Sequence, residues 1–291
     1  MTVGFYLMSE KGLRVLETIT GEYGTDHIAY VLGARDTNVK NDYFDDIMKL
    51  CKEKRIPFVE KNEFNPITAN YAFAVSWRWL IKDIPNLIVL HDSLLPKYRG
   101  FTPLPTALIK GDTVFGVTAL WATDDFDKGD IIGQRSITIS YPIKIHNLIE
   151  LLSHEYCELV SCLYRTLLSS GHLKARKQNE LKATYSLWRD EDDYRIEWGA
   201  DAAYVKRFID SLGYPYKGAS SFLDGRKVRI YDAEVEPPIQ IENRQSGKVL
   251  FIRSGLPIVV CGDGLLRVME LRDDESELSL LPLRKLRSRF T

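Results

Sequence analysis

The stretch "NLIVLHDSLLPKYRG" (86–100) decides the fold of this chain. Its apolar run at 87–90 has no alternating polar positions, which is typical of a strand buried on both faces of a parallel sheet. His91 ends this run, and a loop containing Pro96 and Gly100 follows. Open parallel sheets bind ligands beyond the carboxyl ends of their strands. His91 is therefore either a functional side chain or a polar residue that marks where a buried strand surfaces.

Strand-like and helix-like segments alternate around this stretch, as in a doubly wound sheet. The longest helical pattern, 145–171, has apolar residues at steps of three and four and ends at Gly171, a residue suited to a C-terminal cap. We therefore predict an α/β domain with a Rossmann-like parallel sheet. Strands are expected at 3–8, 27–34, 56–60, 71–77, 86–90, 116–123 and 131–140, and helices at 12–23, 43–55 and 145–171.

The pattern changes near residue 180. Residues 219–236 alternate with a period of two around "DG", which indicates a hairpin, and 247–272 continue with short strands and Gly turns. One short helix is expected at 204–213. The sequence therefore predicts a catalytic domain at 1–180 and a smaller, mainly-β domain at 181–291, an open barrel of the OB-like kind.

Composition narrows the class of protein. The 39 basic and 40 acidic residues of this 291-residue chain nearly cancel, which argues against a broad nucleic-acid footprint. Four scattered cysteines without a CxxC pair indicate reduced thiols. We see no membrane-spanning run and no signal peptide, so we expect a soluble, cytoplasmic protein. No metal is expected, because HExxH motifs and Cys/His arrays are missing, and no GxGxxG or P-loop phosphate cradle occurs.

The loop "DDFDKGD" (124–130) offers a partner for His91. It holds four acids in seven residues, most of which we expect to be solvated. A carboxylate that contacts a strand-end imidazole fixes its tautomer and raises its basicity. Spacing alone leaves four candidates open: Asp124, Asp125, Asp127 and Asp130.

Three motifs in order resemble the folate-dependent N-formyltransferases: "HDSLLPKYRG" (91–100), "GVT" (116–118) and "DKGDI" (127–131). Two later segments, 183–198 and 212–234, resemble the C-terminal domain of the members that act on amino sugars. The resemblance implies direct transfer of a formyl group from 10-formyltetrahydrofolate to a substrate amine. It also implies the site residues: His91 and Asp127 as catalytic residues, and Ser93, Leu94, Leu95, Pro96 and Asp124 at the folate pocket.

Val89 departs from the family pattern, in which an asparagine donates a hydrogen bond to the developing oxyanion. Loss of one such donor typically costs a factor of roughly 10²–10³ in rate. Three explanations stay open. A backbone N–H or the His91 imidazolium replaces the donor, or a different acyl donor such as acetyl-CoA occupies the same groove, or the protein binds ligands without catalysis.

Charge guides the choice of acceptor. Residues 181–291 hold 18 basic and 18 acidic side chains. The family members that act on tRNA resemble one another in a basic insertion after the second strand, whereas the corresponding residues here, 32–42, include only two basic side chains. Both features argue against a methionyl-tRNA substrate. We expect instead a nucleotide-linked deoxyamino sugar, as used for surface polysaccharides such as the O-antigen of lipopolysaccharide.

A nucleotide needs an aromatic ring for its base and one or two cations for its diphosphate. For Trp188 and Tyr214, a role in the core or at the domain interface is an alternative. Whether the protein forms a homodimer stays open. The expected substrate-binding residues are Val89, Lys97, Arg99, Trp188, Arg189, Tyr214 and Tyr216.

Overall fold

The computed structural model describes residues 1–63, 68–81, 84 and 86–291. Their contacts form two compact units. The boundary expected near residue 180 stays a prediction. The first unit comprises Met1–Leu104, Val114–Ile139 and Leu148–Leu187, and the second comprises Pro105–Thr113, Ser140–Asn147 and Trp188–Thr291.

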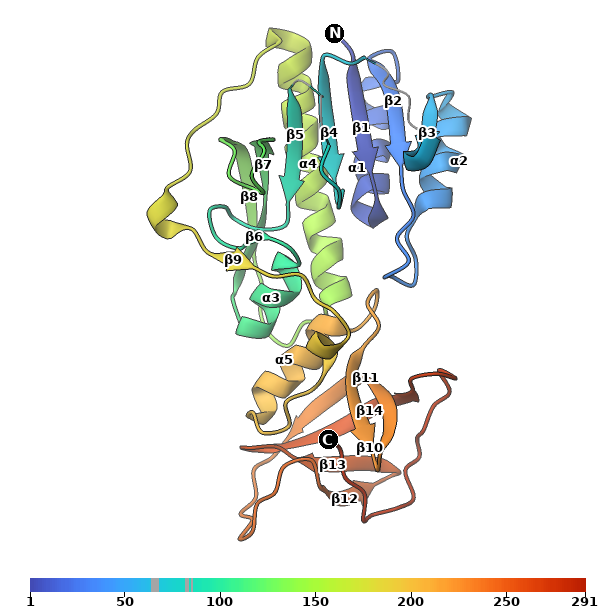
Figure 1. The fold of residues 1–291 in the computed structure, drawn as a ribbon, viewed down its shortest axis with the longest axis vertical. Helices are drawn as coiled ribbons and strands as arrows, with labels where there is room; N and C mark the ends of the chain where they lie inside the picture. The colour runs from blue at the N-terminus through green and yellow to red at the C-terminus, as the bar shows by residue number, and fades with distance from the viewer. Residues whose placement is uncertain (64–67, 82–83, 85) are drawn as a thin grey trace. The chain divides into compact units, whose positions relative to one another are not determined.

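The first unit is built on a seven-stranded sheet of order β3-β2-β1-β4-β5-β7-β8 (Figure 1). The first five strands in this order run parallel, whereas β7 pairs antiparallel with β5 and with β8. This confirms the predicted parallel-sheet α/β domain and adds an antiparallel edge. The strands are β1 (Val3–Leu7), β2 (Ile28–Gly33), β3 (Phe58–Glu60), β4 (Tyr71–Val75), β5 (Leu87–His91), β7 (Val114–Trp121) and β8 (Ile131–Thr138).

Strand alternation divides the buried side chains between the two faces of this sheet. On one face Phe5 stacks on Phe73 at 5.7 Å between ring centroids, and the helices α1, α2 and α4 pack there (Figure 1). On the other face Tyr6 contacts Trp77 edge-on. Both faces are therefore covered, as the unbroken apolar strands predict. The helices are α1 (Ser9–Tyr23), α2 (Phe44–Lys54) and α4 (Ile145–Ser170).

Some short elements carry no signal in the sequence. The two-residue strands β6 (Arg99–Gly100) and β9 (Tyr185–Ser186) pair in parallel across a long separation, and two residues are too few to show a period. A helix, α3 (Pro103–Lys110), was also not predicted. It begins with a proline, which the first turn of a helix accepts. The described residues also form the 3₁₀ turns η1 (Lys61–Glu63), η2 (Glu180–Lys182) and η3 (Asp192–Tyr194).

The second unit holds a five-stranded antiparallel sheet of order β10-β11-β14-β13-β12. Asp224 and Gly225 form the turn between β10 and β11 with φ angles of 50° and 89°, as the "DG" pair predicts. Helix α5 (Ala202–Leu212) begins where the Asp201 carboxylate accepts the Tyr204 N–H at 2.8 Å. The predicted mainly-β domain is confirmed. Its strands are β10 (Ala219–Leu223), β11 (Arg226–Glu236), β12 (Val249–Arg253), β13 (Leu256–Val260) and β14 (Leu265–Asp273).

The last residues of the chain pair with both outer strands of this sheet. Thr291 exchanges two backbone hydrogen bonds with Phe222 on β10, and Ser288 O accepts the N–H of Val249 on β12 at 3.1 Å. Phe290 is only 1% exposed, and its ring lies 5.3 Å from that of Trp198. The C-terminal segment therefore covers both sheet edges and closes the sheet into a barrel.

Because the C-terminal segment closes the sheet in this way, Phe290 should contribute to the stability of the second unit. We expect Phe290→Ala to lower the free energy of unfolding of the second unit by about 3–5 kcal/mol, because it leaves a cavity in the barrel core. Leu286→Ala is the control, since Leu286 is 50% exposed and its truncation should stay within about 0.5 kcal/mol. Urea unfolding followed by tryptophan fluorescence measures both. Equal effects of the two changes would show that the tail does not anchor the barrel.

Candidate active site

His91 is the last residue of β5 and lies at the carboxyl edge of the parallel strands. It pairs in register with Thr118 on β7 and is 7% exposed. Val89 lies two residues earlier, so strand alternation puts it on the same face of the sheet. There it packs against Leu95, Leu120 and Ile131. The strand thus brings the imidazole and an apolar side chain, rather than an amide, to this face.

The His91 ring lies between two hydrogen-bond acceptors. Its Nδ1 is 3.4 Å from Asp127 Oδ2, and its Nε2 is 2.8 Å from the Tyr98 carbonyl oxygen. A neutral imidazole has one N–H and satisfies only one of these acceptors, whereas the imidazolium donates to both. The fold therefore holds the ring between a carboxylate and a carbonyl oxygen.

Asp127 is the one of the four loop acids that pairs with His91. Its backbone has a φ of 56°, and its Oδ2 accepts the Gly100 N–H at 2.7 Å. Asp125 pairs with Lys128 instead, and Asp124 is exposed. Gly129 allows the turn, because a Cβ at that position would lie 1.7 Å from the Trp121 carbonyl oxygen. The fold thus distinguishes Asp127 from its neighbours, which spacing alone could not do.

Thr118 anchors the "SLLP" loop to β7. Its buried hydroxyl donates to the Ser93 carbonyl at 2.6 Å and accepts the Leu95 N–H at 3.1 Å, while Gln134 Nε2 donates to Leu95 O at 3.0 Å. The Ser93 hydroxyl is also used inside the loop, where it donates to the Lys97 carbonyl. Leu94 and Pro96 are half-buried. The loop is thus held in shape before a ligand binds.

A buried charge cluster next to His91 was not predicted from the sequence. Lys11 Nζ contacts both oxygens of Asp92, at 2.6 and 2.7 Å, and the Tyr156 hydroxyl donates to Asp92 Oδ1 at 2.8 Å. Burial by itself raises the pKa of Asp92, but the Lys11 charge and these hydrogen bonds hold that pKa below its ordinary value. The cluster ties α1, the strand end and α4 together. No sequence period connects these three positions.

The expected cation Arg99 is fully buried. Its guanidinium forms two hydrogen bonds to Glu180, at 2.7 and 2.8 Å, and two to Gln178. The hydrogen bonds to Glu180 raise the pKa of Arg99 above its ordinary value. This placement favours a structural role over the expected contact with a phosphate. Lys97, in contrast, is exposed.

The other expected substrate residues belong to the second unit, whereas His91, Lys97 and Arg99 belong to the first. Trp188 is 61% and Tyr214 44% exposed, and Tyr216 is half-buried. Arg189 donates to Thr106 Oγ1 at 3.4 Å within the same unit. The two exposed rings are available for stacking.

Both parts of this chain are similar to known proteins. Residues 67–154 match the formyl transferase family, and residues 189–279 match the formyl transferase C-terminal domain. The methionyl-tRNA formyltransferase of Caldanaerobacter subterraneus is 31% identical over 220 residues, which cover 75% of this chain and 70% of that protein.

Two solved structures share the fold. The N-formyltransferase from Helicobacter canadensis, in complex with folinic acid and dTDP-3-aminofucose, has a TM-score of 0.72 at 15% identity and covers 92% of this chain and 99% of its own. WlaRD, a sugar 3N-formyl transferase, has a TM-score of 0.69 at 17% identity and covers 92% of this chain and 97% of its own.

The fold and the sequence relatives together define an enzyme that transfers a one-carbon acyl group to nitrogen. The chain belongs to the formyl transferase family and is an N-formyltransferase. Across the described ranges, which omit 64–67, 82–83 and 85, no group of three His, Cys, Asp or Glu side chains is placed to hold a metal ion. In the same residues no helix is both long and apolar enough to span a bilayer.

The Lys11–Asp92 pair gives a prediction about stability. We expect Lys11→Met to destabilise the protein by on the order of 3 kcal/mol, because it leaves the Asp92 charge without its partner. The double variant Lys11→Met with Asp92→Asn should recover part of this loss, since no unpaired charge remains. Chemical unfolding of the four members of the cycle measures the coupling, and additive losses would show that the pair does not interact.

The same pair sets a pH dependence. Because the folded pKa of Asp92 is lowered, its stabilising contribution is present above its unfolded pKa of about 4 and is lost as the pH falls below that value. The Lys11→Met variant should therefore lose less stability than the parent protein when the pH is lowered through this range.

Proposed function

We propose that this enzyme transfers a formyl group from 10-formyltetrahydrofolate to the amine of a nucleotide-linked deoxyamino sugar. The contact between His91 and Asp127 at the end of β5, beside the preformed "SLLP" loop, carries the proposal. Imidazole and carboxylate are the groups that proton transfer at neutral pH requires.

In this reaction the acceptor amine attacks the formyl carbon and forms the new C–N bond. The formyl oxygen gains negative charge, which a protonated His91 can stabilise as a donor. Collapse breaks the bond to the folate nitrogen, which leaves with one proton, while the attacking amine loses one. The protonated ring gives its proton to the folate nitrogen as that nitrogen leaves, and the neutral ring then takes the proton that the amine loses, while Asp127 keeps the ring oriented. Protons balance, and no covalent enzyme intermediate is required.

Several observations support folate as the donor. The Helicobacter canadensis enzyme was solved in complex with folinic acid, and WlaRD in the presence of 5-N-formyltetrahydrofolate. In this chain Leu95 adds to an apolar cluster, and Leu94 and Pro96 leave part of their surface exposed beside it, which suits a flat pterin ring. The alternative donor acetyl-CoA rests on Val89 alone, so we do not propose it.

The amino-sugar acceptor rests on charge and on exposed aromatic rings. Residues 181–291 have no net charge, and Trp188 and Tyr214 offer faces on which a base can stack. The bound dTDP-3-aminofucose of the Helicobacter canadensis protein supports the same class of acceptor. A second candidate is methionyl-tRNA, which the 31% identity to a methionyl-tRNA formyltransferase favours.

Mass spectrometry tests the proposal. Incubation with 10-formyltetrahydrofolate and a panel of nucleotide-linked amino sugars should add the mass of one CO unit to one of them. His91→Gln should reduce this activity by about 10²–10⁴-fold, because the proton relay is lost. Formylation of methionyl-tRNA with none of any sugar would replace the proposed acceptor by the second candidate. Transfer that persists in His91→Gln would remove His91 from the mechanism.

Val89 gives a separate prediction. Val89→Asn should raise kcat, by at most about 10²–10³-fold, because the amide adds a donor for the oxyanion. The side chains have similar volume and Val89 is only partly buried, so the fold should persist. Val89→Thr is the control, since its hydroxyl adds polarity without the reach of an amide. A fall in kcat for Val89→Asn with an unchanged unfolding midpoint would show that the apolar surface is needed at this position.

A further inference from the structure

We propose that Gln178, oriented by the buried Arg99, is a positioning residue that holds Asp127 against His91. This inference rests on the proposed function insofar as it assigns His91 and Asp127 to formyl transfer. The role of Gln178 was not predicted from the sequence.

Gln178 binds the backbone of the loop that carries Asp127. Its Nε2 donates to the Asp127 carbonyl at 2.7 Å and to the Gly129 carbonyl at 2.8 Å. These two carbonyls flank Lys128, at the point where the loop returns towards β8. One amide group therefore fixes the main chain on both sides of Lys128.

Arg99 fixes which way this amide faces. Its Nε and Nη2 donate to Gln178 Oε1 at 3.1 and 2.8 Å, so the amide oxygen must face the guanidinium. The NH₂ group is thereby directed at the two loop carbonyls. A rotated amide would set its oxygen against both carbonyls and its NH₂ against a buried cation, which is unfavourable at both ends. Glu180 accepts two further bonds from Arg99 and balances its charge.

The backbone conformation of Asp127 is one that side-chain-bearing residues adopt less often. Asp127 has a φ of 56°, which aspartate tolerates better than most residues, and polar contacts to the loop stabilise it. Its loop neighbours Asp125 and Lys128 pair with each other and are both exposed. Within the part of the chain that the structure describes, the Asp127 carboxylate accepts the Gly100 N–H and lies beside the His91 ring.

Arg99 and Gly100 are consecutive residues of β6, and they hold Asp127 from two directions. Gly100 donates to the carboxylate, and Arg99 acts on the main chain through Gln178. The pairing of β6 with β9 sets the position of both. Gly100 also has a φ of 96°, and a Cβ there would lie 2.7 Å from the Ser186 carbonyl. Groups that orient a catalytic side chain in this way determine how well it is placed.

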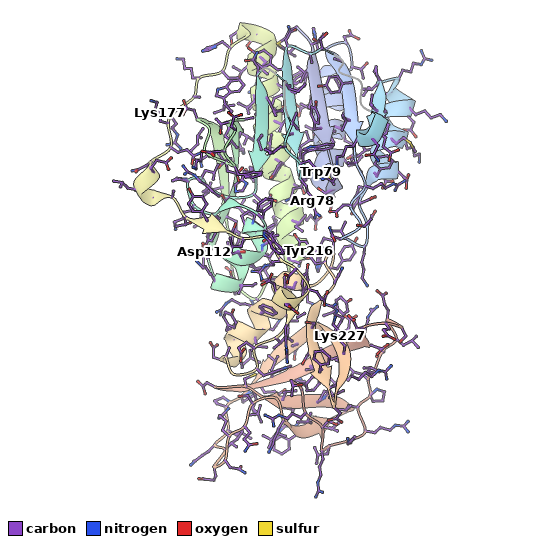
Figure 2. All side chains as sticks on the ribbon, viewed as in Figure 1. Arg78, Trp79, Asp112, Lys177, Tyr216 and Lys227 are labelled. Atoms are coloured by element: carbon purple, nitrogen blue, oxygen red, sulfur yellow. The ribbon has the colours of Figure 1, made fainter. Side chains whose placement is uncertain are left out.

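The first experiment compares Gln178→Glu and Gln178→Ala with Lys177→Ala. Lys177 lies on the same segment, is labelled in Figure 2, and is exposed, so its truncation is a matched control. A carboxylate cannot donate to the loop carbonyls, although it keeps the size of the side chain. We expect Gln178→Glu to lower kcat by about 10²-fold through displacement of Asp127, with KM for both substrates unchanged. The limb of the kcat–pH profile that reports His91 should shift, whereas Lys177→Ala should match the parent protein.

The second experiment needs no turnover. Nitrogen-15 NMR of the imidazole rings, assigned with His91→Gln, should resolve both ring nitrogens of His91 in the parent protein, with Nδ1 facing Asp127. In Gln178→Glu the Nδ1–H signal should weaken or exchange with water, because Asp127 no longer faces it. This readout decides the positioning role even if the parent protein transfers no formyl group, an outcome that would contradict only the proposed function.

Two results would overturn the inference. One is an unchanged His91 signal together with an unchanged pH profile in Gln178→Glu, even if kcat and the unfolding midpoint both fall, since that pattern marks a purely structural residue. The other is full activity of Gln178→Ala. The variant Arg99→Lys tests the orientation of the Gln178 amide, because an ammonium lacks the planar pair of donors for Gln178 Oε1. We expect Arg99→Lys to show part of the shift in the kcat–pH profile that Gln178→Glu shows.

Discussion

The placement of one carboxylate beside one imidazole is the constraint on which this site depends. His91 comes from the end of a buried strand, where sheet pairing leaves it little freedom. Asp127 comes from an exposed loop and holds an uncommon backbone conformation. The distance of 3.4 Å between them is therefore set on one side by the core and on the other by polar contacts to β6 and to Gln178. The proton chemistry that we propose requires both.

Two buried charge groups lie on either side of the "HDSLLPKYRG" stretch. Asp92 pairs with Lys11 behind His91, and Arg99 pairs with Glu180 and Gln178 beyond the loop. Buried ion pairs contribute little net stability, because desolvation offsets most of the attraction. Breaking one is costly, however, so such pairs disfavour alternative arrangements of the loop. In this enzyme they hold both ends of the stretch in one position.

Two features of the fold depend little on the identity of particular side chains: the position of Val89 and the closure of the barrel. Val89 packs in an apolar cluster at the position where the family pattern has an asparagine, so the sheet tolerates the exchange. The chemistry that we propose uses His91 as the donor in place of that amide. The barrel is closed by the last residues of the chain through backbone bonds to both outer strands. Because backbone hydrogen bonds depend little on the side chains, no sequence motif predicts this pairing.

The sequence alone determined the alternating α/β pattern, the hairpin at Asp224–Gly225 and the strand that ends at His91, because hydrophobic period and turn chemistry are local properties. Family motifs also singled out Asp127, which spacing could not separate from Asp124, Asp125 and Asp130. Only the tertiary structure showed that Arg99 is buried, that Lys11 neutralises Asp92, and that Gln178 supports the Asp127 loop. These contacts join residues about 50 to 80 positions apart, and no local pattern encodes such a pairing. The physical reason is that buried polar groups must find partners, and the partner is decided by which surfaces the fold brings together.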